Sequence, residues 1–402
     1  MQVGKLCRSL IITVQMLEPD NKIPANRCGF VLQPEQLDEN PKEWDEDSEG
    51  GIDDESNWAE TVALTTCVRE EWKDGRCIWH AKRPDKPVER LRASRTRNAE
   101  CLDGAILDRT EWPDGVSFDD CSLIALQWRD GVAHRATFEN ARLTGSEFTD
   151  GDFTDARLIN AELQGARFRE ANFGHADFSE ADLYAAEFPD ANLEFTDFHG
   201  STLRNAIFTD AALKNGRFID SDLFNADFTN ADLRTSDFGD ASLLQTKFTD
   251  CDLSVAEFPD AKLVLADLRG AILHGGKLTR ADCSGADFTG ALLYEVVLSD
   301  TQINASTTFY DSESTYYDSI TSRPTCVYEE NPLTADDLGD DIHRFEAARW
   351  VYRRLETLYE ENAMSEEARR FHISKEEAER KLHAERGEWK GQLIKGAMRW
   401  LT

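Results

Sequence analysis

The sequence predicts a repeat solenoid flanked by a small N-terminal region and a helical C-terminal region. From Phe138 to Ile303 an apolar residue returns at every fifth position, and Cys283 is the one member outside the set of Phe, Leu and Ile. A small residue stands two positions before each of these apolar residues, with Val296 as the one bulky exception. An α-helix repeats every 3.6 residues or so and a strand every two, so a period of five fits neither. A fixed short period is typical of repeat architectures.

The charge of the chain restricts its partners. Its 402 residues carry 77 acidic and 45 basic side chains, a formal net charge of −32. Such a surface repels a phosphate backbone, so we expect no direct nucleic acid binding. Two interpretations of the excess of acidic side chains stay open. One is adaptation to molar salt, where the Debye length is only about 3 Å, and the other is a surface that imitates DNA. Acid also crowds the stretch from Asp45 to Glu55, outside the repeat, which favours halophilic adaptation.

Residues 1–100 are expected to form a separate cap domain of α+β or metal-stapled type. Cys28, Cys67, Cys77 and His80 are residue types that bind zinc tetrahedrally, and two residues separate Cys77 from His80, as in a ligand knuckle. One structural zinc would supply folding energy that so small a core lacks. The alternative is that these thiols are buried beside aromatic residues, as free cysteines often are.

The repeat unit reads small, polar, Leu or Phe, and then two polar or small residues, as in residues 181–185 and 231–235. These units closely resemble the pentapeptide-repeat family. The resemblance implies a mainly β fold, a right-handed quadrilateral β-helix with one pentapeptide on each face and about twenty residues in each coil. We expect residues 101–309 to form this β-helix.

In such a coil the Leu or Phe and the small residue point inward, and the other three positions point outward. From residue 168 to residue 258 we interpret the large position as a strict alternation, with Phe at positions ending in 8 and Leu at those ending in 3. Two opposite faces would then carry Phe and the other two Leu, as stacked ladders inside the solenoid. The pattern starts at Leu102 and slips by one residue around Pro113–Gly115, which predicts a loop or bulge between coils.

Carboxylates recur at the second position of the unit, as in Asp222, Asp232, Asp252 and Asp282. They recur because the repeat recurs, whereas an active site breaks a pattern. We therefore expect no catalytic residues and no enzyme activity, and no cofactor apart from the zinc.

Beyond the array, residues 310–336 lose the repeat and are expected to cover the last coil as an irregular linker. Residues 337–402 form the C-terminal module, with one apolar stripe from Phe345 to Leu358 and another from Ala368 to Leu382. Ser365 is expected to be the N-cap of the second helix. The short connection predicts an antiparallel helical hairpin, through which the chain is expected to form a homo-oligomer.

The segment from Trp389 to Leu401 is net basic and holds two Trp, the composition of an interfacial helix at a membrane surface. The alternative is a last helix that packs on the hairpin or on a second subunit. An array followed by helical residues such as 350–356 also resembles pentapeptide-repeat proteins that continue into a membrane-embedded ion-channel domain. The sequence has no apolar run of about eighteen residues, and its nine cysteines are scattered. We therefore expect a cytoplasmic protein at the inner face of the membrane.

The sequence favours a non-enzymatic protein-interaction scaffold built on a rigid acidic solenoid, as the cytoplasmic part of a membrane-associated or ion-channel protein. The alternative is a DNA-mimicking inhibitor of a type II topoisomerase such as gyrase, because some pentapeptide-repeat proteins resemble duplex DNA in width and charge. Those proteins generally lack so long an N-terminal region and helical tail, which favours the scaffold.

Overall fold

The structure is a computed structural model that describes residues 76–83, 86–95, 100–310, 317–318, 323–324, 326, 328 and 344–386. Cys28, Cys67 and the segment Trp389–Leu401 lie outside the described residues. The chain divides into two compact units, Met1–Arg217 and Phe218–Thr402.

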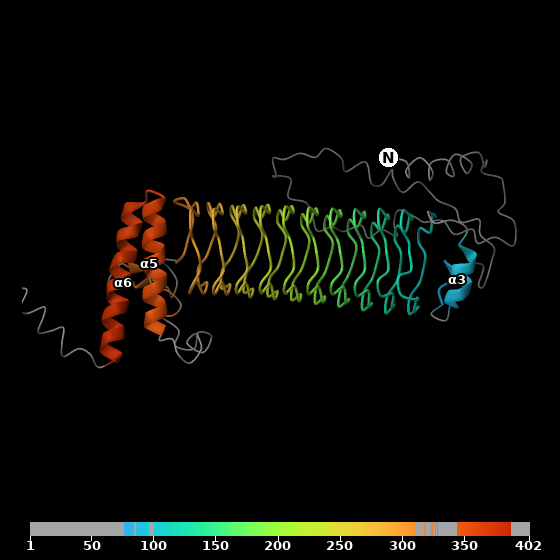
Figure 1. The fold of residues 1–402 in the computed structure, drawn as a ribbon, viewed down its shortest axis with the longest axis horizontal. Helices are drawn as coiled ribbons and strands as arrows, with labels where there is room; N and C mark the ends of the chain where they lie inside the picture. Colours follow the sequence, from blue (N-terminus) through green and yellow to red (C-terminus); the bar gives the residue numbers. More distant parts are fainter. Residues whose placement is uncertain are drawn as a thin grey trace, which may run out of the picture. The chain divides into compact units, whose positions relative to one another are not determined.

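Both units contain stacked coils of a four-sided β-helix (Figure 1). Each side of a coil forms one parallel β-bridge to its counterpart in the next coil, twenty residues later over nearly all of the array. In the first unit the bridges run from Cys101–Ser122 to Asp197–Arg217, and in the second from Asp222–Ser242 to Asp287–Thr308. Four five-residue sides therefore make one coil, and the predicted β-helix solenoid is confirmed.

A left-handed residue at the fifth position turns the chain at each corner. Asn140 has a φ of 56°, and the non-glycine corners of the array lie between 52° and 62°. Gly, Asn and Asp occupy this region at least cost because they lack a bulky side chain or bond to their own backbone. This constraint explains why Asp, Asn and Gly recur at the fifth position.

The carboxylate at the second position caps the turn that follows it. In each of the four repeats that the sequence singled out, Oδ1 accepts the N–H two residues later, at 3.0 to 3.2 Å: Asp222, Asp232, Asp252 and Asp282. Asn172 does the same for the N–H of Gly174, at 3.2 Å. The position thus needs an oxygen acceptor, as in other Asx turns, and a neutral amide meets that need.

The interior is filled by the large and small inward residues. In the first unit Phe168, Phe188 and Phe208 stack face to face, with centroids 4.4 and 4.8 Å apart. Half a coil away, Phe178 stacks on Phe198 at 5.2 Å. The two ladders meet edge to face, the geometry that aromatic quadrupoles favour. The prediction of Phe on two opposite faces is confirmed here.

The prediction of a strict alternation from residue 168 was wrong at one position, because residue 173 is Phe and not Leu. Phe153 and Phe173 stack on each other at 5.1 Å on a third face, where Leu would otherwise stand. In the second unit the opposed ladders return with Phe218, Phe238 and Phe258, 4.8 and 4.9 Å apart. A third face of the first unit can therefore also hold phenylalanine, where two such rings stack on each other.

The predicted one-residue slip lies where the sequence placed it. The bridge Glu111–Val132 spans 21 residues, whereas Ser117–Thr137 spans 20. The extra residue is accommodated beside Gly115, whose φ is 71°. The bridges from Cys101 and Ile106 also span 21 residues, and near the end of the array a further 21-residue bridge joins Asp287 to Thr308.

In the first unit, the buried Trp79 covers the first coil. Its ring lies 6.2 Å from that of Trp112 and so extends the aromatic interior. Its carbonyl accepts the Ile106 N–H at 2.8 Å, in the place where a carbonyl of a preceding coil would otherwise accept it. The helix α3 (Val88–Ser94) holds it in place, because Trp79 Nε1 donates to Ser94 Oγ at 2.8 Å. The buried Lys86 ammonium donates to the carbonyls of Trp79 and Ile106.

The second unit continues beyond its coils into a small hairpin and two helices. Strands β1 (Tyr317–Asp318) and β2 (Arg323–Pro324) pair antiparallel. The helices α5 (Arg344–Glu361) and α6 (Ser365–Glu385) pack side by side (Figure 1). The predicted N-cap was wrong: Ser365 is the first residue of α6, and Met364 takes the cap position without a side-chain hydrogen bond. Neither of these helices, nor α3, is long and apolar enough to cross a membrane.

Each coil is hydrogen-bonded through its backbone to the coil that follows it, always in the same pattern. Within the described part of the chain, the last coil is followed by no further coil that could supply these hydrogen bonds. Gln302 shows the pattern: its N–H donates to the Ala281 carbonyl at 2.9 Å, and its own carbonyl accepts the Cys283 N–H at 2.8 Å. One residue of the next coil therefore satisfies two groups of the coil before it. At the end of the array such groups need another partner, because an open edge invites pairing with other chains.

Asn362, in the connection between α5 and α6, supplies that partner with its side chain. Its Nδ2 donates to the Thr301 carbonyl at 2.9 Å, and its Oδ1 accepts the Ile303 N–H at 3.0 Å. The primary amide thus replaces one residue of a following coil, donor for donor and acceptor for acceptor. Ala363, with a left-handed φ of 61°, turns the chain directly after it.

We predict that Phe208→Ala lowers the free energy of unfolding by about 3–5 kcal/mol, because it leaves a cavity in a stacked ladder. Urea denaturation measures the change. The matched control is Phe195→Ala: Phe195 is 50% exposed at a corner, so its removal should cost far less. A loss below about 1 kcal/mol for Phe208→Ala would contradict the interior packing.

We also predict that Asn362→Leu destabilises the last coil by about 1–3 kcal/mol for each group left unsatisfied. Hydrogen exchange is the sharper measurement, since the Ile303 amide should exchange faster. Asn362→Asp is the control: it keeps the acceptor for Ile303 and loses the donor to Thr301, so Ile303 should stay protected. Unchanged Ile303 exchange in Asn362→Leu would refute the amide cap.

Candidate interaction surface

The structure brings together the described half of the predicted metal set. Cys77 and His80 lie in one buried turn, with Cys77 Sγ 3.2 Å from His80 Nδ1. His80 Nε2 lies 3.0 Å from the Asp103 carbonyl. A carbonyl accepts, so Nε2 carries the hydrogen and Nδ1 presents its lone pair toward Cys77. Metal-binding histidines are commonly oriented in this way by a carbonyl.

The ligand set is incomplete within the described part of the chain. Cys28 and Cys67 lie outside it, and no group of three or more His, Cys, Asp or Glu residues inside it is placed to hold a metal. Two ligands at zinc bond lengths and the tetrahedral angle stand about 3.5 Å apart, so the Cys77–His80 distance fits a shared ion. The metal site remains a prediction.

Thiols inside the array have a different character. Cys251 and Cys283 occupy inward positions, and burial raises the pKa of both thiols well above the usual range. Cys251 Sγ donates to the Phe228 carbonyl at 2.7 Å. Both thiols stay protonated, and neither has the thiolate character that metal binding or nucleophilic attack requires.

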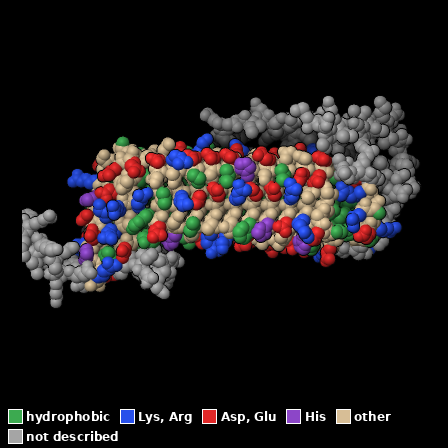
Figure 2. Space-filling model, viewed as in Figure 1, with side chains coloured by type: hydrophobic (Ala, Val, Ile, Leu, Met, Phe, Trp, Pro, Cys, Tyr) green, Lys and Arg blue, Asp and Glu red, His purple; other side chains and the backbone are tan. Residues whose placement is uncertain are grey.

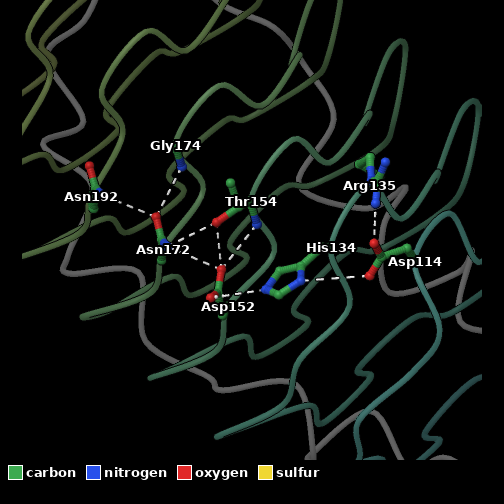
Figure 3. A network of polar contacts seen from close by, with 8 residues as sticks. All are labelled: Asp114, His134, Arg135, Asp152, Thr154, Asn172, Gly174 and Asn192. Atoms are coloured by element: carbon green, nitrogen blue, oxygen red, sulfur yellow. Dashed lines mark hydrogen bonds and ion pairs between the residues drawn. The ribbon is translucent and has the colours of Figure 1, made fainter.

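A polar network crosses several coils on the outside of the first unit (Figure 3). Its centre is His134, with Nε2 3.1 Å from Asp152 Oδ2 and Nδ1 3.7 Å from Asp114 Oδ1. Asp114 belongs to the loop that holds the extra residue. Asn172 Nδ2 donates to Asp152 Oδ1 at 3.1 Å, and Asn192 Nδ2 donates to Asn172 Oδ1 at 3.0 Å.

The ionisation and the hydrogen bonds of Asp152 indicate that this network has a structural role. Burial raises the pKa of Asp152, but hydrogen bonds from Thr154 and His134 outweigh it and hold the pKa below its usual range. Asp152 therefore stays ionised and acts as an acceptor. Its Oδ1 receives both the N–H and the hydroxyl of Thr154, at 3.2 and 2.6 Å. The side chains thus link neighbouring coils.

Acidic side chains gather in columns at the corners. In the first unit one corner is acidic in five successive coils, all exposed and left-handed: Asp130, Asp150, Glu170, Asp190 and Asp210. In the second unit a corner carries Asp220, Asp240, Asp260 and Asp300, with Arg280 between them. Coils stacked about 4.8 Å apart bring these like charges close together along one edge. Figure 2 shows acidic side chains recurring along the visible face, with Lys and Arg among them.

The axial charge density can be compared with that of DNA. Residues 138–217 make four coils and carry 15 acidic and 7 basic side chains, a net of −8. Four coils rise about 19 Å, so one net negative charge falls on each 2.4 Å or so of the axis. Duplex DNA carries one per about 1.7 Å. The first unit is thus somewhat less densely charged than DNA.

Three corners carry large apolar side chains, which the sequence analysis missed. Phe195, Val255 and Leu265 are 49–52% exposed and left-handed, with φ values of 58–62°. Phe195 also stacks on His175, one coil away at the same corner, at 4.8 Å. The signal in the sequence was a bulky residue at a fifth position, where Asp, Asn or Gly is expected.

Comparison with known families identifies the array. Residues 132–208 match the family model described as a pentapeptide repeat region. Residues 205–240, 236–275 and 277–306 match the model for pentapeptide repeats in eight copies. Among curated proteins, none matches the chain.

Several solved structures of pentapeptide-repeat proteins are similar to parts of the chain. One is HetL of the cyanobacterium Nostoc sp. strain PCC 7120, involved in heterocyst differentiation regulation, with 21% identity, 56% of this chain and 96% of that chain covered, and a TM-score of 0.28. Another is QnrB1, a plasmid-mediated fluoroquinolone resistance protein, with 18% identity, 49% and 92% coverage and a TM-score of 0.29. A protein of the Arabidopsis thaliana thylakoid lumen shares 30% identity, with 30% and 72% coverage and a TM-score of 0.15.

The geometry of Cys77 and His80 leads us to propose that one zinc ion is bound there together with Cys28 and Cys67. Protein purified without chelator should contain about one zinc per chain, because structural zinc binds tightly at neutral pH. Elemental analysis measures it. Cys77→Ser should lose the metal, whereas the matched buried thiol variant Cys251→Ser should retain it. Wild-type protein with well under one zinc per chain would refute the site.

Proposed function

Because the chain belongs to the pentapeptide-repeat family, we propose that it acts as a non-enzymatic protein-interaction scaffold. Its solenoid presents outward side chains in straight columns at one-coil intervals. Columns of this kind form an extended binding surface, which is how repeat proteins commonly engage partners.

The observation that carries this proposal is the acidic corner of the first unit. Five exposed acidic residues follow one another there, from Asp130 to Asp210. Asn172 performs the capping role of an Asp elsewhere in the array, and Asn140 and Asn160 adopt the corner conformation. The fold therefore does not require these charges. They favour a partner with a basic face, drawn in by electrostatic steering.

The place of the scaffold in the cell is part of the same proposal. We propose that it is the cytoplasmic part of a membrane-associated or ion-channel protein, at the inner face of the membrane, with residues 389–401 in contact with lipid. The hairpin of α5 and α6 is the proposed contact for a homo-oligomer. The basic and aromatic composition of residues 389–401 supports the membrane contact.

The alternative is a DNA-mimicking inhibitor of a type II topoisomerase such as gyrase. The observation that favours it is the net charge of the coils, one per about 2.4 Å of the axis against about 1.7 Å in duplex DNA. Arginine pairs reduce that density locally, as where Arg217 meets Asp197 at 2.5 Å. A supercoiling assay with gyrase decides: no inhibition at micromolar protein removes the mimic.

The scaffold is tested by site-specific photocrosslinking in the cells of origin. A benzoylphenylalanine at Glu170, in the middle of the acidic column, should give one discrete crosslinked protein. The triple variant Asp150→Asn, Asp190→Asn, Asp210→Asn should weaken that product severalfold without unfolding the coils, because Asn tolerates left-handed φ. The same label at Ala185, on another corner, is the control. A product unchanged by neutralisation, or no discrete product, would overturn the acidic surface.

A further inference from the structure

An apolar ribbon runs along one corner of the second unit. Phe224, Leu244 and Val264 occupy the same place in three successive coils and are half-buried. Backbone hydrogen bonds fix their register, because Asn225 N–H donates to the Leu244 carbonyl and Gln245 N–H to the Val264 carbonyl, both at 3.0 Å. Other outward positions of the array are mostly polar.

Leu265 completes the ribbon at the cost of strain and exposure. It is 52% exposed, and its φ of 58° is unfavourable for a branched apolar residue. Its side chain lies over Gly285, where an added Cβ would stand 2.8 Å from Leu265 Cδ2. The fold does not need leucine here, because Asn205 and Asn225 adopt the same corner conformation. The exposed side chain of Leu265 therefore extends the apolar surface of the ribbon without being required by the fold.

Charged residues border the ribbon on both neighbouring faces. The bridged residues beside it are Asp222, Ser242, Lys262 and Asp282 on one face, and Asp227, Lys247, Asp267 and Asp287 on the other. Five carboxylates thus stand against Lys247, Lys262 and the guanidinium of Arg269, which pairs with Asp267 and Asp287, an excess of two negative charges. An apolar centre with a charged rim is the usual anatomy of a protein-binding site, and the excess of carboxylates selects a basic occupant.

We propose that residues 387–402 of this chain bind the ribbon in the absence of a membrane, because the same side chains cannot contact lipid and the ribbon at once. The segment holds Lys390, Lys395 and Arg399 against Glu388, so it is net basic. Its apolar residues Trp389, Leu393 and Ala397 recur every four positions, the spacing of one helix face.

The spacing of the two partners also agrees. If the segment binds as a helix, residues four positions apart stand about 6 Å apart along its axis, against about 4.8 Å between successive coils. Three apolar side chains at that spacing would each come close to one of Phe224, Leu244 and Val264. The segment follows α6 and belongs to the same unit as the ribbon.

The test places a benzoylphenylalanine at Leu265 in the full-length chain. After illumination and digestion, mass spectrometry should find the crosslink in residues 387–402. Mixing isotope-labelled with unlabelled protein shows whether the segment comes from the same copy or a second one, and either result supports the contact. A crosslink to any other segment, or none, overturns the proposal.

The matched control places the same label at Val255. That residue is equally exposed, at 49%, and equally left-handed, but Ser254 and His274 stand beside it. It should give at most a tenth of the crosslink to residues 387–402. A second variant of the Leu265-labelled chain, Lys390→Glu with Lys395→Glu and Arg399→Glu, should reduce the crosslink at least severalfold. Equal yields from Val255, or no loss on charge reversal, would each contradict the assigned site.

Discussion

The left-handed residue at every fifth position is the constraint on which the rest of the structure depends. It turns the chain by one corner after each short extended segment, so four units return the backbone to its starting side. Once the coil closes, the inward positions follow and the interior becomes a stack of like side chains. The polar positions are placed on the outside by the same geometry. Inward and outward residues are thus assigned by the backbone conformation, and burial then selects Phe, Leu and Ala inside.

This constraint shows what the fold requires of the acidic positions: an oxygen acceptor or a left-handed backbone, and not a negative charge. A second-position residue needs an oxygen to cap the turn, and a corner residue needs to accept left-handed φ. Asn172 meets the first need and Asn140 the second, both without charge. The net charge of the array is therefore a property of its surface that the coil itself does not require.

The sequence predicted the coil and its interior well, because burial acts on every repeat and a repeated demand leaves a repeated pattern. The slip near Gly115 was visible for the same reason, as a break in that pattern. Features that occur once were not predictable. Asn362 is one polar residue in a short connection, and its role depends on two backbone groups sixty positions earlier. Which nitrogen of His80 carries the proton depends on the Asp103 carbonyl, whose position near His80 the sequence does not show. Helix α6 starts one residue earlier than predicted, and Met364 takes its cap position without a side-chain hydrogen bond.

The amide of Asn362 binds a backbone carbonyl and a backbone N–H, groups that nearly every residue carries. The terminal contact therefore does not read the sequence of the coil on which it sits. A duplication or deletion of twenty residues within the second unit would present the same two groups at the same place. The length of the solenoid can thus change in evolution by whole coils while its ending is inherited unchanged, so that the extent of the outer surface and the means of closing the last coil vary independently.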